Sequence, residues 1–233
     1  MRFLGLLSLL LALNVQAQYT NESELAIVQT GGNSEVQTTN AKTLNVYKWQ
    51  LNQVKIGGHY TYGESDNGVS ARNWDVNTRY EREISSHLSL TAGEIIEGNR
   101  FTGVKARYNS DVGAKYFYIK SDLKNFFSEL GYRYAIEDRY EPNPNTFDNK
   151  ARFFNELNHK ISETVQYRLW IEYIPNFTES KDYLINGEAS ITSILNSVFS
   201  LKVSYLGMYD NRPAFDGYKN YDYTTTTSLV AKF

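Results

Sequence analysis

The most regular pattern in the chain is an alternation of two kinds of residue over the final segment, 221–233. One set consists of Tyr221, Tyr223, Thr225, Thr227, Leu229, Ala231 and Phe233, and the intervening set is more polar and includes Asp222 and Lys232. Side chains of a β-strand point alternately to opposite faces, so one face can meet an apolar phase and the other a polar phase. Because chain ends fray unless they are held, a strand that ends on Phe233 favours one that closes a barrel in a membrane.

Eleven further segments have the composition or alternation of strands, which brings the expected number to about twelve. We expect the strands near 23–31, 38–49, 53–63, 72–84, 88–98, 105–119, 125–137, 150–161, 164–175, 182–194, 198–209 and 221–233. The pattern is weaker in 38–49, where neither face is apolar, and in 88–98, where Glu94 interrupts the face of Leu88, Leu90 and Ala92. No segment shows convincing helical periodicity.

The connections between these segments alternate in length. Short connections lie near 51–53, 85–87, 120–124, 162–163 and 196–197, and longer polar ones near 63–71, 99–105, 137–149, 176–181 and 210–220; the first, after Gly31, is also short. Short periplasmic turns and longer extracellular loops are typical of outer-membrane barrels. The sequence therefore predicts an all-β fold for residues 18–233, an antiparallel transmembrane β-barrel of about 12 strands. Its last strand should pair with the first near Glu24 to Gly31.

Composition is compatible with this fold. The 19 Tyr, 12 Phe and 3 Trp suit the aromatic girdles of a barrel. A mean hydropathy of −0.50 does not exclude a barrel, because inward polar residues offset outward apolar ones. The net charge of −2 gives no sign of nucleic-acid binding, and the absence of cysteine excludes disulfides.

The first residues have the composition of a secretory signal peptide. Arg2 precedes an apolar run from Phe3 to Leu13, and Val15-Gln16-Ala17 offers a small-residue cleavage site. We expect residues 1–17 to be removed after export, and together with the predicted barrel this favours a mature protein in the outer membrane of a Gram-negative cell. The expected partners are outer-membrane lipids, lipopolysaccharide and, during insertion, the barrel-assembly machinery, with a monomer favoured.

Two short motifs resemble a known family. The segment Ala26-Ile27-Val28-Gln29-Thr30-Gly31-Gly32-Asn33 resembles the first strand and turn of the YdiY-like salt-induced outer-membrane protein family. Asn99-Arg100-Phe101-Thr102-Gly103, followed by Arg107 and Gly113, does so as well, although an acidic residue is expected at Asn99. The resemblance implies an outer-membrane β-barrel and, through the family's name, a link to salt stress. It implies no activity, since the function of that family is unknown.

The polar faces of the expected strands carry charges of both signs. The residues expected to line the lumen are Arg79, Glu81, Arg107, Asp111, Lys115, Glu129, Arg133, Arg152, Glu156, Arg168, Glu172, Glu188 and Lys202. Two functions remain open for them. Either they line a narrow porin-like path for small solutes, or they pair with one another and fill the lumen of a barrel that has a structural role in the envelope. Phe233 is the expected membrane assembly signal.

Two alternatives from other classes have weaker support in the sequence. An outer-membrane lipid hydrolase would use His59 with Ser65 or Ser70 near the outer rim, but no nucleophile motif supports it. A secreted soluble β-barrel binding protein would also alternate, but it would not need the same distribution of loops and aromatics. We expect no enzyme activity, no cofactor and no metal, because the three histidines are far apart and cysteine is absent.

Overall fold

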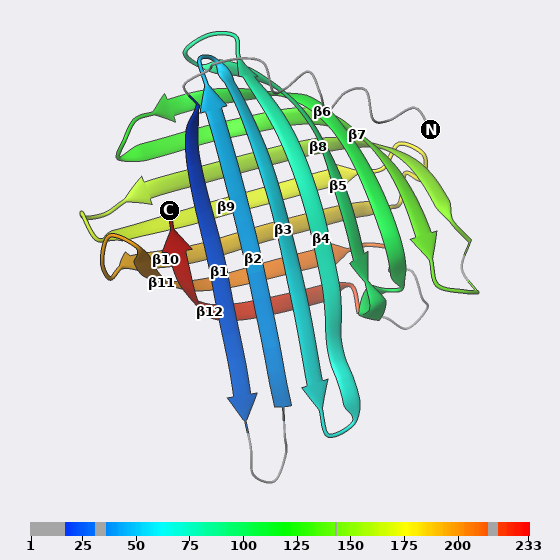
Figure 1. Cartoon of the computed structure of the whole chain (residues 1–233). Coiled ribbons are helices and arrows are strands. Elements are labelled where there is room, and N and C mark those ends of the chain that lie inside the picture. Colours follow the sequence, from blue (N-terminus) through cyan, green and yellow to red (C-terminus); the bar gives the residue numbers. More distant parts are fainter. Residues whose placement is uncertain (1–16, 31–35, 143, 214–218) are drawn as a thin grey trace, which may run out of the picture.

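Twelve antiparallel strands form a closed barrel in the computed structural model, which describes residues 17–30, 36–142, 144–213 and 219–233. Each strand pairs with its neighbours in sequence, and the last pairs with the first (Figure 1). The strands are β1 (Gln18–Thr30), β2 (Val36–Trp49), β3 (Asn52–Ser65), β4 (Gly68–Glu83), β5 (Leu88–Asn99), β6 (Val104–Lys120), β7 (Lys124–Arg139), β8 (Thr146–Lys160), β9 (Val165–Pro175), β10 (Tyr183–Ile194), β11 (Phe199–Asp210) and β12 (Tyr221–Lys232). The predicted fold class and number of strands are confirmed. The expected signal peptide up to residue 16 and the Gly31–Asn33 turn lie outside the described residues.

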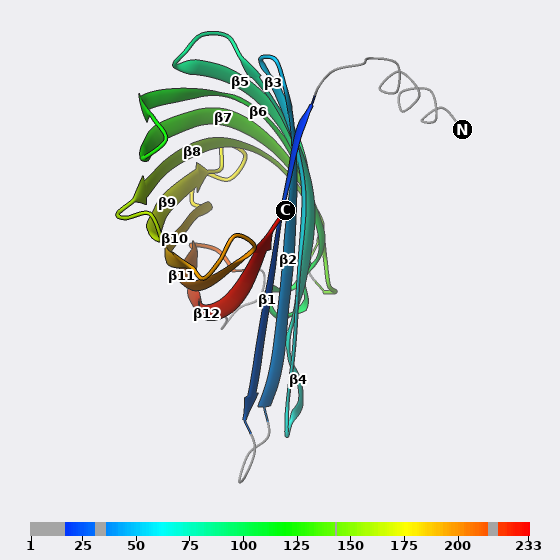
Figure 2. The same ribbon diagram turned by 60° about the vertical axis from the view of Figure 1, so that its left-hand side comes forward.

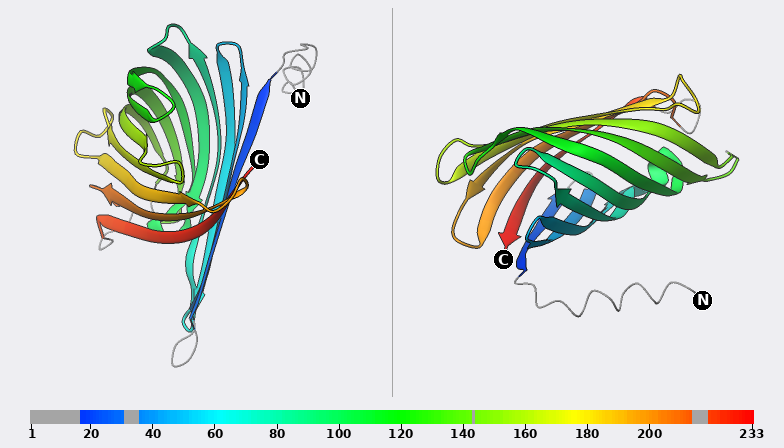
Figure 3. Two further views of the ribbon diagram at one scale, coloured as in Figure 1. Left: turned by 90° about the vertical axis from the view of Figure 1, so that its left-hand side faces the viewer. Right: turned by 90° about the horizontal axis from the view of Figure 1, so that it is seen from above.

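The wall of the barrel differs in shape around its circumference. Strands β1–β4 form a nearly flat part, and β5–β12 curve around to meet it (Figures 2 and 3). The β1–β2 and β3–β4 hairpins project beyond the other strands at the loop end (Figures 1 and 2). Among the described residues, no helix is long and apolar enough to cross a membrane.

The predicted difference in loop length holds for only half of the barrel. The turns at one end contain two to four residues, and the loops after β7, β9 and β11 at the other end contain six to ten. The predicted long loop at 63–71 is wrong, because only Asp66 and Asn67 separate β3 from β4. Glu64 and Ser65 pair with Val69 and Gly68, so both strands extend into the expected loop.

Glycine permits two of these tight connections. Gly68 has a φ of 97°, a left-handed conformation that is open to glycine and strained for other residues. The connection after β5 is similarly shorter than predicted. It contains the 3₁₀ turn η2 (Arg100–Thr102), which ends at Gly103 with a φ of 81°.

The barrel closes through a short seam between β1 and β12. Four residue pairs join the strands, from Glu22 with Lys232 to Leu25 with Leu229. Backbone hydrogen bonds of 2.8 and 2.9 Å between Asn21 and Phe233 extend the seam toward the short-turn end. The predicted pairing near Glu24 to Gly31 is therefore wrong for most of that range, because β12 meets the earlier part of β1.

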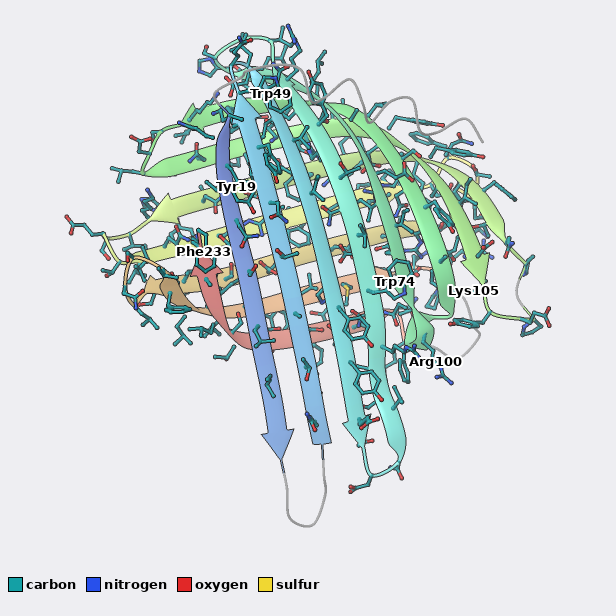
Figure 4. All side chains as sticks on the ribbon, in the orientation of Figure 1. Tyr19, Trp49, Trp74, Arg100, Lys105 and Phe233 are labelled. Carbon is teal, nitrogen blue, oxygen red and sulfur yellow. The ribbon has the colours of Figure 1, made fainter. Side chains whose placement is uncertain are left out.

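The outward face is apolar between two groups of aromatic side chains. At the short-turn end, ring centroids lie 4.9 Å apart for Tyr19 and Tyr47 and 5.0 Å apart for Tyr118 and Phe126. At the loop end, Tyr183 stacks on Tyr209 with centroids 5.9 Å apart. The labelled residues follow this division, with Tyr19 and Trp49 toward one end and Trp74 toward the other (Figure 4).

Between the two aromatic groups, the outward face is mostly aliphatic. Exposed aliphatic side chains in this band include Leu25, Ile56, Val76, Leu90, Val112, Leu130, Ile171, Val203 and Leu229. An apolar band flanked by aromatic girdles is the surface that a transmembrane barrel presents to lipid.

Candidate functional site

The inward face of the barrel is lined by charged side chains, and we take this charged lumen wall as the candidate site. Strand register places all thirteen predicted lumen residues on the face opposite the exposed apolar side chains. Alternation along each strand accounts for this, because the aliphatic residues between them turn outward.

Strands β6 and β7 carry a ladder of opposite charges. Three pairs lie directly across from each other, spaced by four residues along each strand: Arg107 with Glu137, Asp111 with Arg133, and Lys115 with Glu129. The sign of the charge alternates along each strand. The Arg133 guanidinium binds both carboxylate oxygens of Asp111 at 2.7 Å, a bidentate geometry that fixes both side chains.

A central network converges on Glu129. Its carboxylate lies 2.8 Å from nitrogen atoms of both Arg79 and Arg152 and 3.5 Å from Lys115 Nζ. Lys115 also binds Glu81. Glu129, Glu81 and Lys115 are each less than a tenth exposed, so this part of the wall is tightly packed. Arg152 binds Glu172 in turn, which extends the network from β4 to β9.

A second network continues around the wall to the seam. Arg168 lies 2.5 Å from Glu156 and 3.4 Å from Glu188. Lys202 lies 3.8 Å from Glu188 and 3.2 Å from Glu24 on β1. The Ser228 hydroxyl on β12 donates a 2.6 Å hydrogen bond to Glu24, so a lumenal carboxylate supports closure of the barrel.

These ion pairs run around the wall. In the described part of the chain, none joins strands more than three positions apart in the barrel order, whereas opposite walls are six positions apart. Lys42 on β2 faces inward by register with His59 and is nevertheless exposed. The Lys42 side chain is therefore accessible beside β2, and the ion pairs among the described residues do not bridge the lumen.

The lumen also contains charged residues that the sequence prediction omitted. Lys42 was missed because neither face of β2 is clearly apolar. Lys55 shares the polar face of His59 and Thr61 on β3, and this alternation was a usable signal. Glu24 lies in the first strand, where Leu25 and Ile27 on the opposite face indicated its orientation.

The structure does not assemble the serine site considered for a hydrolase. His59 lies 3.3 Å from Asp75, and its Nε2 lies 2.9 Å from the Thr61 hydroxyl. Ser65 instead donates to the Gly68 carbonyl, so it is engaged elsewhere.

Among the described residues, the hydroxyl that hydrogen-bonds to His59 is that of Thr61, which belongs to a nearly buried network. Asn40 donates to Thr61 Oγ1 at 2.8 Å, and Thr61 is 9% exposed. We interpret His59, Asp75 and Thr61 as a hydrogen-bonded part of the lumen wall.

A family model described as "Protein of unknown function, DUF481" matches residues 23–233. The chain belongs to the DUF481 family. Nothing in this match connects this DUF481 protein with salt induction. No curated protein matches it.

Solved structures with a similar fold are outer-membrane porins and channels. A NanC porin aligns with 92% of this chain and 98% of its own length, with a TM-score of 0.53 and 12% identity. The COG4313 outer membrane channel from Pseudomonas putida F1 aligns over 95% and 97%, with a TM-score of 0.54 and 8% identity. At these identities the comparison shows the fold alone, and this DUF481 protein has the fold of a porin-like outer-membrane barrel.

Proposed function

We propose that this DUF481 protein is a narrow passive channel of the Gram-negative outer membrane that admits small polar or charged solutes. The observation that carries the proposal is the arrangement of the lumenal charges. Their ion pairs follow the wall, and the inward-facing Lys42 remains exposed. A water-filled path lined by charged side chains is how such barrels select solutes.

The location and partners belong to the same proposal. The apolar band between two aromatic groups suits a lipid bilayer, and export through a cleaved segment 1–17 would deliver the chain to the outer membrane. Lipids and lipopolysaccharide would contact the outer surface, and the assembly machinery would bind the terminal strand. No catalytic role is included. A contribution to salt tolerance is supported only by the resemblance of two short motifs to the salt-induced family.

Planar-bilayer recordings test the channel. Protein purified from outer membranes and shown to be folded by heat-modifiable gel migration should produce discrete conductance steps, and the same protein unfolded by heat should not. Folded protein that inserts and remains silent would contradict the channel and favour the structural, plugged barrel.

A further inference from the structure

The ammonium group of Lys55 lies within hydrogen-bonding or ion-pairing distance of no described residue. Lys55 faces inward from β3 and is half-buried. No hydrogen bond or ion pair joins it to any described residue, unlike Lys115 and Lys202 on the same face. A charged group that is partly removed from water without a partner is costly, so such a group marks a place where a counter-charge is favoured.

The surroundings of Lys55 contain charged groups of both signs. Arg79 lies directly across from it on β4, and like charges in such cross-strand positions repel. Lys115 also repels it, whereas Glu81 and Glu156 attract it. Glu81 binds Lys115 and Glu156 binds Arg168, and neither carboxylate lies within ion-pairing distance of Lys55. Arg79 and Arg152 likewise bind Glu129, so Lys55 is left without a direct counter-charge among the described residues.

Lys42 provides a second unpaired ammonium on the same part of the wall. It faces the lumen between Glu24 on β1 and His59 on β3, and although Glu24 and Asp75 attract it, no described residue lies within ion-pairing distance of it. Val46, which lies across from Lys55, is four residues further along β2, so the two lysines are about 13 Å apart along the strands. Successive weak sites of one sign allow an ion to enter and to leave.

The carboxylates of the central lumen are all engaged. Glu24, Asp75, Glu81, Asp111, Glu129, Glu156, Glu172 and Glu188 each lie within ion-pairing distance of a lysine, arginine or histidine. Asp222 has no such partner among the described residues, but it lies at the loop end of β12. Lys55 and Lys42 are therefore the charged groups in the middle of the lumen that form no ion pair with a described residue.

We propose that Lys55, followed by Lys42 toward the loop end, forms an anion-contact site that makes the lumen selective for small anionic solutes. The proposal names the solute class for the channel function proposed above and rests on it. An anion at Lys55 would supply the negative charge that the neighbouring carboxylates, already shared by Arg79, Lys115 and Arg152, do not provide.

Ion selectivity is the first test. The reversal potential in a KCl gradient should show a permeability ratio that favours chloride over potassium. Lys55→Gln should lower that ratio about two- to threefold, the effect of one unit charge at roughly 8 Å in water, and Lys55→Glu should favour potassium. Lys181→Gln is the matched control, because it removes the same charge from an exposed loop position and should change nothing. A conducting wild-type barrel that prefers potassium, or a Lys55→Gln ratio equal to that of wild type, would overturn the anion site and leave the channel intact.

A binding measurement tests the anion site without relying on conductance. Folded barrels in detergent are acylated on their amines with acetyl N-hydroxysuccinimide, with or without pyrophosphate, and each lysine is quantified by mass spectrometry. Pyrophosphate should reduce acylation at Lys55 and Lys42 and leave Lys181 unchanged. If pyrophosphate protects Lys55 from acylation in a barrel that does not conduct in bilayers, the result would support the anion site and contradict the channel. Unchanged acylation of Lys55, or no acylation at all in the folded barrel, would overturn the site.

Discussion

Glu94 is a charged residue that faces outward from the middle of a strand. It lies on the same face of β5 as Leu90 and Ala92, between Thr78 on β4 and Ser110 on β6. The Ser110 hydroxyl donates a 2.7 Å hydrogen bond to its carboxylate. In a transmembrane barrel this position meets hydrocarbon, where one hydroxyl offers less stabilisation than water.

Replacing Glu94 with leucine should therefore stabilise the barrel. We expect the free energy of unfolding to rise by roughly 1–2 kcal/mol, since acidic residues on the lipid face of a barrel cost somewhat less than basic ones. Urea titration of the protein in lipid vesicles, followed by tryptophan fluorescence, measures this change. Glu163→Leu, in an exposed short turn, is the control and should stay within about 0.5 kcal/mol of wild type. Destabilisation by Glu94→Leu would show that the carboxylate makes an interaction that outweighs the cost of a charge on the lipid-facing surface.

At the scale of elements, the seam is the weakest pairing in the barrel. β1 and β12 share four register pairs, whereas β1 and β2 share thirteen. The two backbone hydrogen bonds of Phe233 are thus a large part of the contact that closes the sheet. The aromatic side chain itself is 71% exposed at the short-turn end, which leaves it accessible to the assembly machinery that we propose as a partner.

Two variants separate the backbone contribution of Phe233 from that of its side chain. Deletion of Phe233 should lower both the yield of assembled barrel and the temperature at which its gel migration changes, because the seam loses hydrogen bonds. Phe233→Ala keeps those bonds, so its heat stability should match that of wild type. Its assembly yield in cells should fall if the ring is an assembly signal. Wild-type yield from Phe233→Ala would remove the ring from that role, and wild-type heat stability after deletion would contradict the seam contribution.

The sequence predicted the strands well and their ends less well, for a physical reason. Alternation over many residues is a strong signal, and it placed lumen residues such as Arg133 and Glu172 on the inward face. Glu64, Ser65 and Val69 are compatible with either a loop or a strand, and only pairing with the neighbouring strand decides between them. The position at which β12 meets β1 depends on the accumulated register of all twelve strands, which no local pattern contains.

The partners in each ion pair likewise could not be predicted from the sequence. Opposite signs on alternating faces indicated that lumenal pairs were possible, but the partners of Glu129 come from β4, β6 and β8. Closure and strand tilt bring these side chains together. Which lysines remain unpaired is consequently a property of the whole barrel, and Lys55 could be identified as unpaired only from the assembled wall.

The orientation of the whole molecule can be tested with a single thiol, because the native chain contains no cysteine. Ser180 lies in the loop between β9 and β10, and Ser197 lies in the short turn between β10 and β11; both are exposed. The loop end should face outward and the short-turn end the periplasm. On intact cells, a bulky membrane-impermeant maleimide should label Ser180→Cys and spare Ser197→Cys. Both should react equally once the outer membrane is disrupted, which controls for thiol reactivity. Labelling of only Ser197→Cys on intact cells would indicate the opposite orientation. Equal labelling of both variants on intact cells would contradict insertion across the membrane.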